Sequence, residues 1–466
     1  QRLRFGEDDM VTSPQTTNVP SVAWKNAVIV GLGATGFSVA RYLFGRGMQV
    51  TVVDAQPNPP LAMQLAKIAP GIDIRTGEDD VNNLRSADVL IVSPGVSFDH
   101  PTVRKAQDIG IEIVGDIELF ARAVTAPVIG ITGSNGKSTV TQWLAVLLRV
   151  AGHKVLVGGN IGPPALDLLA NEPPECYVLE CSSFQLESTQ SLCLRAGAIL
   201  NVTPDHLDRY VDLTAYQAAK WRIAKGSQTL VINRQDPFLV QQAANYSGAL
   251  VTFGLDAPPG PNDLGMVRAN GDDWLTRGDE RLISATEISL IGRHNLANAL
   301  AAMALALEFT RLTSQELCSG LRAFDGLPHR CEVVGDWRGI RWINDSKGTN
   351  VGATIAALEG LDRPVVLIAG GQAKTSDFSG LSSALSKRAT HLVVFGQDAK
   401  RIARSVDASI GVTQVEQLAQ AVDVAAGEAH MGDVILFSPA CASYDQFDNF
   451  EHRGDVFRQL VKERHA

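Results

Sequence analysis

Residues 127–148 read PVIGITGSNGKSTVTQWLAVLL, and this stretch decides the fold. A short apolar run with β-branched residues, PVIGIT, leads into a loop of glycine and small polar residues, and a helical pattern begins at TQWLAVLL. A buried strand, a glycine-rich loop and a helix in this order form the repeating unit of parallel α/β sheets. The stretch therefore predicts an α/β fold.

The loop of this unit, TGSNGKST (132–139), ends like a P-loop. In a P-loop the backbone N–H groups surround phosphates, a lysine contacts the terminal phosphates, and a hydroxyl binds Mg²⁺. Thr132 stands where the strict pattern has its first glycine, so an ordinary glycine-rich turn is the alternative. We expect the loop to bind a nucleoside triphosphate through Gly133, Asn135, Gly136, Lys137, Ser138 and Thr139.

Outward from this loop, similar apolar runs end in loops rich in Gly, Ser or Asn and fall into three groups. The expected strands are 26–30, 51–54 and 88–95, then 127–132, 176–180, 197–203 and 229–233, then 341–345, 364–371, 391–396 and 433–440. This grouping predicts three domains, at residues 24–115, 116–326 and 327–466. Residues 1–23 are polar and rich in Pro and Thr, and we expect a flexible tail there.

Composition narrows the class of protein. Of the 466 residues, 45% are hydrophobic and 20% are charged, which is typical of globular domains with sizeable cores. The net charge of −9 argues against a nucleic-acid partner, because such binding depends on clustered Lys and Arg. The six cysteines form no CxxC pair, which fits a reducing cytosol. Since no apolar run approaches the roughly 18 residues of a membrane span, we expect a cytoplasmic protein without membrane insertion.

A second glycine motif, GLGATG (31–36), follows the first predicted strand, and Asp54 ends the next one. It matches GxGxxG, in which glycines let the backbone approach a pyrophosphate while the acid contacts a ribose. The motif alone leaves three interpretations open: an NAD site, a site for the diphosphate of another nucleotide, or a tight turn without a ligand.

Glu180 and His206 each lie where a predicted strand of the second group ends. Active-site groups of open α/β sheets project from the carboxyl ends of the strands, where the P-loop also lies. A carboxylate and an imidazole at this edge are able to serve a metal ion beside the phosphates. The alternatives are a helix cap for Glu180 and a surface turn for His206.

Seven motifs, in this order along the chain, resemble the Mur ligases of peptidoglycan synthesis, and among them the ligases that add D-glutamate. The motifs are TGSNGKST (132–139), LECSSFQLE (179–187), NVTPDHLDR (201–209), GRHNLANALAA (292–302), GLPHRCEVV (326–334), INDSKGTN (343–350) and SPACASYDQFDNFEHRG (438–454). Several of them are long, and together they cover nearly the whole chain, so the combination is specific.

The resemblance implies an N-terminal Rossmann-like domain for the UDP part of a substrate, a central P-loop ATPase with a mainly parallel sheet, and a C-terminal Rossmann-like domain for the amino acid. It implies that ATP activates a carboxylate as an acyl phosphate, which the amino acid attacks through a tetrahedral intermediate. The implied substrates are UDP-N-acetylmuramoyl-L-alanine, D-glutamate and ATP, with two Mg²⁺ ions, and we expect a monomer. GLGATG then belongs to a uridine-diphosphate site, which displaces the NAD interpretation.

Matching the motifs residue by residue implies roles for single side chains. The implied catalytic residues are Lys137, His206, Lys220 and Lys347, and the implied metal ligands are Ser138, Glu180, His206 and Lys220, the last as a carbamate formed from CO₂. Beyond the P-loop, the implied ATP contacts are Asn298, Arg330 and Asp345. The implied contacts to the UDP-linked substrate are Gly33, Ala34, Thr35, Asp54, Ser93 and Asn160, and those to the amino acid are Thr349, Lys374, Ser443, Tyr444 and Phe450. Taken alone, Lys220 on a predicted helix would be a solvated side chain.

Three alternatives remain in view. A related ligase that adds lysine or diaminopimelate, or a folylpolyglutamate synthase, would share the ATPase centre. An NAD-dependent oxidoreductase would use GLGATG to bind NAD for hydride transfer, but the motif TGSNGKST would then have no function. A nucleotide-gated binding module would hydrolyse ATP without consuming an amino acid.

Overall fold

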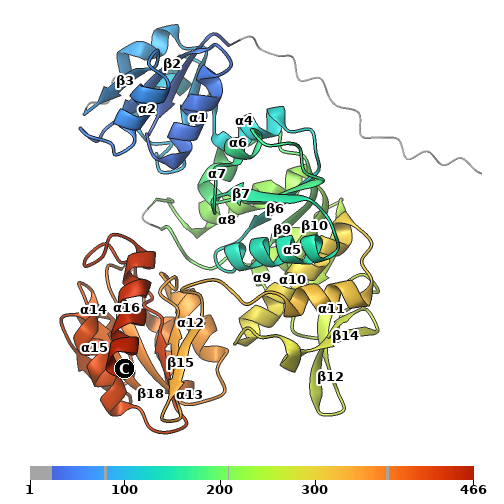
Figure 1. Cartoon of the computed structure of the whole chain (residues 1–466), viewed down its shortest axis with the longest axis vertical. Coiled ribbons are helices and arrows are strands. Elements are labelled where there is room, and N and C mark those ends of the chain that lie inside the picture. Colours follow the sequence, from blue (N-terminus) through green and yellow to red (C-terminus); the bar gives the residue numbers. More distant parts are fainter. Residues whose placement is uncertain (1–23, 78–80, 208, 374–376, 466) are drawn as a thin grey trace, which may run out of the picture.

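The computed structural model describes residues 24–77, 81–207, 209–373 and 377–465. Within these residues the chain forms three separate β-sheets with helices packed on them, arranged from the N-terminal to the C-terminal domain along the long axis (Figure 1). The predicted α/β fold with three domains is therefore confirmed. The boundaries at residues 115 and 326 stay a prediction, and the predicted tail lies outside the described residues.

The N-terminal domain has a parallel sheet in the order β3-β2-β1-β4-β5. The order reverses beside β1, and in such sheets ligands bind at this point, outside the carboxyl ends of the strands. The strands are β1 (Asn26–Val30), β2 (Gln49–Asp54), β3 (Asp73–Thr76), β4 (Val89–Val92) and β5 (Glu112–Val114). The helices are α1 (Ala34–Phe44), α2 (Ala62–Ile68) and α3 (Pro101–Asp108), with a 3₁₀ helix η1 (Val81–Ser86).

The central domain has a nine-stranded sheet in the order β14-β13-β12-β11-β10-β9-β6-β8-β7. Its strands are β6 (Val128–Thr132), β7 (Val155–Gly159), β8 (Cys176–Glu180), β9 (Leu194–Ile199), β10 (Ser227–Asn233), β11 (Ala249–Phe253), β12 (Leu264–Ala269), β13 (Asp272–Arg277) and β14 (Glu280–Ser284). Its helices are α4 (Asp116–Ala123), α5 (Lys137–Val150), α6 (Ala165–Leu168), α7 (Ser183–Glu187), α8 (Leu213–Trp221), α9 (Pro237–Ala243), α10 (Arg293–Phe309) and α11 (Ser314–Arg322), with 3₁₀ helices η2 (Arg222–Gly226) and η3 (Ala285–Glu287).

The C-terminal domain has a six-stranded sheet in the order β15-β16-β20-β17-β18-β19. The strands are β15 (Glu332–Trp337), β16 (Ile340–Asn344), β17 (Val365–Gly370), β18 (Ala389–Phe395), β19 (Gly411–Gln414) and β20 (Val434–Phe437). The helices are α12 (Val351–Glu359), α13 (Ser379–Arg388), α14 (Ala399–Ser405), α15 (Leu418–Glu428) and α16 (Phe450–His465).

Every predicted strand overlaps an observed one, and most neighbouring strands pair in parallel. Two antiparallel additions were not predicted. They are the β12-β13-β14 meander at one edge of the central sheet and the β15-β16 hairpin at the start of the C-terminal domain. Among the described residues, no helix is both long and apolar enough to cross a membrane.

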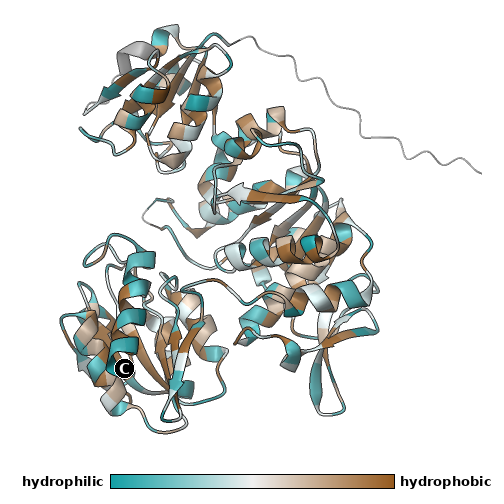
Figure 2. Cartoon of the chain, viewed as in Figure 1, coloured by the Kyte–Doolittle hydropathy of each residue, from teal (hydrophilic) through white to brown (hydrophobic). Residues whose placement is uncertain are grey.

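The strands at the centre of each domain are the most hydrophobic parts of the chain (Figure 2). One continuous core joins the first two domains and extends from Ile29 of β1 to Leu230 of β10. At this junction Ser38 Oγ of α1 donates a hydrogen bond to Asp167 Oδ1 of α6 at 2.6 Å. The N-terminal domain is therefore packed against the central one rather than joined only by its linker.

Asp116 is a buried acid at the same junction, where it begins α4. Its carboxylate accepts a hydrogen bond from Gln185 Nε2 at 2.9 Å. Burial nevertheless raises the pKa of Asp116 from 3.8 to about 6. A carboxyl whose pKa is raised by folding stabilises the fold while it is protonated, so this contribution is lost as the pH rises through about 6.

We expect Asp116→Asn to change how stability depends on pH. Because Asn stays neutral and keeps an acceptor for Gln185, the variant should gain stability relative to the wild type between about pH 4 and pH 7, by up to about 3 kcal/mol. Thermal unfolding midpoints across this range measure the gain. Asp99→Asn, at an exposed aspartate that pairs with Arg104, is the control, and a difference between Asp116→Asn and wild type that stays constant with pH would contradict the assignment.

Candidate active site

The predicted P-loop lies between β6 and α5 of the central domain. β6 ends at Thr132, and α5 begins at Lys137 after Gly136, which is left-handed with φ 85°. A side chain at Gly136 would be strained by this φ and would place its Cβ 2.5 Å from Asn298 Oδ1. Glycine thus lets the loop turn directly into a helix N-terminus, which is a favourable place for phosphate groups.

The Lys137 ammonium lies over this loop. Its Nζ donates to the carbonyl oxygen of Gly133 at 2.9 Å and to that of Ser134 at 3.1 Å. A cation held at this place by backbone carbonyls is positioned to transfer its hydrogen bonds to a phosphate that enters the loop.

Ser138 and Glu180 bring oxygen atoms together beside the P-loop. Ser138 Oγ donates to Glu180 Oε2 at 2.6 Å, and Asn160 Nδ2 donates to Oε1 at 2.6 Å. Mg²⁺ usually takes one or two protein oxygens and completes its shell with phosphate oxygens and water. The pair therefore fits a magnesium ion bound together with a nucleotide. Among the described residues, no group of three or more His, Cys, Asp or Glu side chains is arranged as a metal site by itself.

Lys220 is a buried lysine on α8, with 2% of its surface exposed. Its Nζ donates to the carbonyl oxygen of Gly133 at 2.8 Å and lies 4.6 Å from the centre of the Tyr216 ring. Burial, and secondly the nearby Lys137 ammonium, hold the pKa of Lys220 well below its usual range. The sequence alone favours a solvated lysine, and the structure shows instead an amine enclosed behind the P-loop.

His206 lies at a strained position of the loop that follows β9, with φ 56°. Its Nε2 is 3.7 Å from Asp205 Oδ2, and its ring packs edge-on against Phe184 with centroids 4.9 Å apart. A non-glycine residue at positive φ persists only where its surroundings stabilise it, and such residues gather at functional sites.

The C-terminal domain adds two cations to the same place. Arg330 Nη2 donates to Ser138 Oγ at 2.6 Å, and burial lowers the pKa of this guanidinium. Burial, followed by repulsion from Arg330 and Lys137, lowers the pKa of Lys347 to about 8. Because like charges crowd here, an anion placed between them would be bound favourably.

Asp345 is a buried acid of the same domain. Burial raises the pKa of Asp345 to about 6, although the carboxylate accepts bonds from Ser438 Oγ at 2.7 Å and from the Cys331 backbone N–H at 3.2 Å. Arg330 lies close enough to counter this shift. The carboxylate is therefore held rigidly at the wall of the cavity described next.

Two cavities meet at the P-loop. The larger, of about 400 Å³, separates the central from the C-terminal domain and is lined by Thr139, Asn298 and Asp345. The smaller, of about 240 Å³, is lined by the side chains expected to act on the reacting groups, namely Lys137, Ser138, Asn160, Glu180, His206, Lys220 and Thr349. Both cavities are lined by Asn135, Gly136, Arg330 and Lys347. A ligand with phosphates at the P-loop would therefore extend from one cavity into the other.

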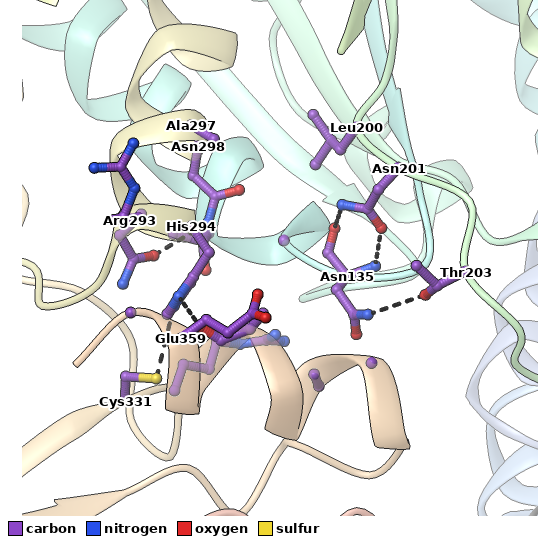
Figure 3. Close-up of a pocket in the computed structure, with 18 of the residues that line it drawn as sticks. Asn135, Leu200, Asn201, Thr203, Arg293, His294, Ala297, Asn298, Cys331 and Glu359 are labelled. Carbon is purple, nitrogen blue, oxygen red and sulfur yellow. Dashed lines mark hydrogen bonds between the residues drawn. The ribbon is translucent and has the colours of Figure 1, made fainter. Parts of the chain in front are cut away.

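The larger cavity has the character of a nucleoside site. Asn298 and His294 of α10 lie on one side of it and Asn135 of the P-loop on the other (Figure 3). Burial lowers the pKa of His294 to about 4, so its imidazole is neutral, and Nδ1 lies 3.1 Å from the carbonyl oxygen of Ala356. Apolar lining comes from Leu200, Phe253 and Leu255. Neutral polar groups beside apolar walls suit a base better than further phosphates.

The glycine loop of the N-terminal domain also has the predicted form. Gly33, Ala34 and Thr35 form the start of α1. A Cβ at Gly36 would lie 1.9 Å from the Gly31 carbonyl oxygen, so helix and loop approach as closely as the motif requires. Supporting bonds join Leu32 N–H to Asp54 Oδ2 at 2.6 Å and Ser93 Oγ to the Gly31 carbonyl oxygen at 2.9 Å. These bonds show how the loop is held, and contacts with UDP stay a prediction.

The predicted amino-acid site is only partly assembled around the smaller cavity. Thr349 lines this cavity, and the Phe450 ring lies 3.8 Å from Lys347 Nζ. Ser443 is buried outside the lining of both cavities, and the Tyr444 side chain is exposed. Lys374 lies outside the described residues. Binding of glutamate by these residues stays a prediction.

Asn350 was not predicted from the sequence as a site residue, yet its side chain forms hydrogen bonds between the C-terminal and the central domain. Its Nδ2 donates to Asn135 Oδ1 at 3.1 Å and to Asp205 Oδ2 at 3.0 Å, both in the central domain. The same side chain caps α12 by accepting from the Ala353 N–H at 2.8 Å. An Asn before a helix indicates a cap, and no further signal in the sequence points to the bond across domains.

Comparisons with known proteins agree with this geometry. Three family profiles match in order along the chain: the MurD-like N-terminal domain of Mur ligases at residues 25–115, the Mur ligase middle domain at 131–306, and the glutamate ligase domain of Mur ligases at 329–441. The UDP-N-acetylmuramoylalanine–D-glutamate ligase of Nitrosococcus oceani is 48% identical over 95% of this chain and 98% of its own. The chain belongs to the Mur ligase family.

Further relatives support the membership in this family. The UDP-N-acetylmuramoylalanine–D-glutamate ligase of Shewanella oneidensis is 45% identical over 94% of this Mur ligase and 98% of its own chain. Among solved structures, the MurF ligase of Thermotoga maritima in complex with ADP has a TM-score of 0.60 at 16% identity and covers 89% of this chain and 96% of its own. At that identity the structural likeness confirms the fold of this Mur ligase and nothing finer.

Proposed function

We propose that this Mur ligase joins D-glutamate to UDP-N-acetylmuramoyl-L-alanine and converts ATP to ADP and phosphate. Relatives with this activity in their names match nearly the whole chain, and the C-terminal profile is that of a glutamate ligase domain. ATP and a UDP-linked precursor are cytoplasmic metabolites, so we propose that the protein acts there, as a monomer with domains at residues 24–115, 116–326 and 327–466.

The observation that carries the proposal is the convergence of four basic side chains from two domains around one small cavity. Lys137 and Lys220 come from the central domain, and Arg330 and Lys347 come from the C-terminal domain. Transfer of a phosphoryl group to a carboxylate brings several negative charges together, which such a cluster offsets. A module that only binds a nucleotide does not need a second anion site beside the phosphates.

The reaction begins at the carboxylate of the UDP-linked substrate, which is a poor electrophile at neutral pH. Its oxygen attacks the γ-phosphorus of ATP while the bond from that phosphorus to the β,γ-bridging oxygen breaks, which gives ADP and an acyl phosphate. The amine of glutamate then attacks the carbonyl carbon, and the tetrahedral intermediate expels phosphate as the nitrogen loses a proton. Lys137, Arg330 and Lys347 orient and neutralise the groups, which is most of the catalytic task.

Positions around the two cavities assign the other roles. We propose that Asn298 and Asp345 contact the nucleoside of ATP, and that Asn160 and Thr349 contact the groups that react. Ser138 and Glu180 would hold magnesium, which neutralises phosphate oxygens when bound. The UDP moiety would bind at Gly33, Ala34, Thr35, Asp54 and Ser93, and glutamate would bind at Lys374, Ser443, Tyr444 and Phe450.

We further propose that Lys220 carries a carbamate, which would serve a second magnesium ion together with His206. Only a neutral amine attacks CO₂, and burial lowers the pKa of Lys220, which increases the share of the neutral form. The new N–C bond converts the amine to an anion and releases a proton, so a lower pH should reverse the modification. An anion here would also attract the nearby Lys137 ammonium.

The carbamate is tested by carbon NMR after the protein is equilibrated with ¹³C-bicarbonate. We expect one carbamate resonance that weakens as the pH is lowered and that disappears in Lys220→Ala. Lys225→Ala, at an exposed lysine close to the end of the same segment, is the control and should keep the resonance. A wild-type protein that gives no such resonance in the presence of magnesium and ADP would contradict the carbamate.

The function itself is tested by phosphate release with ATP, UDP-N-acetylmuramoyl-L-alanine and single amino acids of both configurations. We expect D-glutamate, and not L-glutamate, lysine or diaminopimelate, to stimulate release by at least about a hundredfold. Stimulation by another amino acid would contradict the proposed substrate but not the ligase class. Equal release with and without any amino acid would instead support a nucleotide-gated binding module.

A further inference from the structure

Arg209 links the N-terminal domain to the loop that carries His206. Its Nη1 donates to the carbonyl oxygen of Pro94 at 3.0 Å, and its Nη2 donates to that of Val96 at 2.6 Å. These two carbonyl groups follow Ser93, whose hydroxyl supports the glycine loop at Gly31. Arg209 of the central domain therefore holds the backbone of the loop where we place the UDP moiety.

The same guanidinium is joined to His206 in two ways. Its carbon Cζ lies 4.2 Å from the centre of the Phe184 ring, which packs edge-on against the His206 imidazole at 4.9 Å. In addition, the backbone N–H groups of Arg209 and Tyr210 both donate to the His206 carbonyl oxygen, at 3.0 and 3.1 Å. A displacement of Arg209 would therefore move the imidazole in two ways, through the backbone hydrogen bonds to the His206 carbonyl oxygen and through the Phe184 ring.

Further aromatic rings, which form a cluster with Phe184, connect it with the P-loop. Tyr210 stacks on Phe184 with centroids 5.7 Å apart and packs edge-on against Tyr216 at 5.3 Å. The Tyr216 hydroxyl lies 3.0 Å from Ser134 Oγ within the P-loop. Because rings packed in this way shift together, the cluster connects the Pro94–Val96 loop with the phosphate-binding loop.

We propose that Arg209 is a positioning residue, which couples occupation of the UDP site to the alignment of His206. This inference rests on the proposed function. Arginine suits the task because its planar fork donates to two carbonyl groups while its face stacks on a ring. A lysine would offer one compact ammonium in place of the planar fork and would lose the stacking contact. The loop that binds one end of the substrate and the imidazole near the other end thereby move as one unit.

Steady-state kinetics test the coupling with three variants. We expect Arg209→Ala to raise the KM for UDP-N-acetylmuramoyl-L-alanine and to lower kcat, each by about tenfold, while the KM values for ATP and D-glutamate change by less than about twofold. Arg209→Lys should recover part of both losses. The control is Arg222→Ala, because Arg222 also donates to two carbonyl groups, those of Leu186 and Thr189 at 2.7 and 2.9 Å, but within the central domain alone.

Two kinetic outcomes would overturn the proposal. In one, Arg222→Ala produces the same pattern of kcat and KM as Arg209→Ala, which means that any lost carbonyl contact has this effect. In the other, Arg209→Ala lowers only the melting temperature and leaves both kinetic constants unchanged.

A measurement without turnover separates this inference from the proposed function. With ¹⁵N-labelled histidine, and with the His206 ring signal assigned by His206→Gln, saturating UDP alone should shift that signal in the wild type and in Arg222→Ala but not in Arg209→Ala. An equal shift in Arg209→Ala would overturn the coupling. If the wild type instead fails to release phosphate in response to D-glutamate, the proposed function fails, while the comparison of ring signals still decides the role of Arg209.

Discussion

Lys137→Ala is expected to lower the rate of ATP-dependent ligation by about a thousandfold, which is the loss typical of removing one preorganised donor at a developing charge. The Lys137 ammonium lies over the P-loop, held by the Gly133 and Ser134 carbonyl groups. Lys220 donates to the same Gly133 carbonyl oxygen at 2.8 Å but is only 2% exposed, so we do not expect it to take the place of Lys137 at the phosphates. Initial rates of phosphate release at saturating substrates measure the loss.

Lys154→Ala is the matched control, since Lys154 is an exposed lysine of the same domain that pairs with Glu172 at 3.1 Å. It should keep the wild-type rate. Both variants should unfold at nearly the same temperature as the wild type, because neither side chain contributes to the core. Unchanged turnover in folded Lys137→Ala would remove the basis for phosphate transfer at this loop.

The strands that the sequence predicted well are the ones buried on both faces. β8, Cys176–Glu180, is buried throughout and matches the run CYVLE in the sequence. Parallel strands covered on both faces appear as continuous apolar runs, which are easy to recognise. β13 and the edge strand β14 carry Asp, Arg and Glu and are partly exposed, so their pairing depends on neighbours that no local pattern reveals.

The residues of the candidate site also differ in how far the sequence predicted them. The local sequence pattern predicted the roles of Lys137 and Glu180, because a loop or a strand end indicates where such a side chain points. Lys220 and Arg330 were assigned only by resemblance, since their environment comes from distant parts of the chain. Lys220 contacts the Gly133 carbonyl across 87 positions, and Arg330 contacts Ser138 across 192. Burial and proximity of this kind exist only in the folded chain.

Glu180→Gln is expected to reduce kcat by about a hundredfold to a thousandfold and to raise the Mg²⁺ concentration needed for half-maximal rate. The substitution keeps the shape of the side chain and an acceptor for Asn160, but it removes the negative charge beside Ser138. Arg330, whose Nη2 donates to Ser138, would then lose the nearby charge of Glu180 and keep that of Asp345. The rate should be measured over a wide range of magnesium concentrations.

Glu175→Gln supplies the matched control, because Glu175 precedes the other end of β8 and bonds to the Lys154 N–H at 3.0 Å near the surface. It should leave the magnesium dependence unchanged. If Glu180→Gln lowered kcat without changing this dependence, the carboxylate would act by orienting Ser138 and Arg330 and not by holding the ion. A shifted dependence, together with weaker protection of the fold by Mg²⁺ and ADP in thermal unfolding, would place the ion at Glu180, since a ligand that binds the native state less tightly stabilises it less.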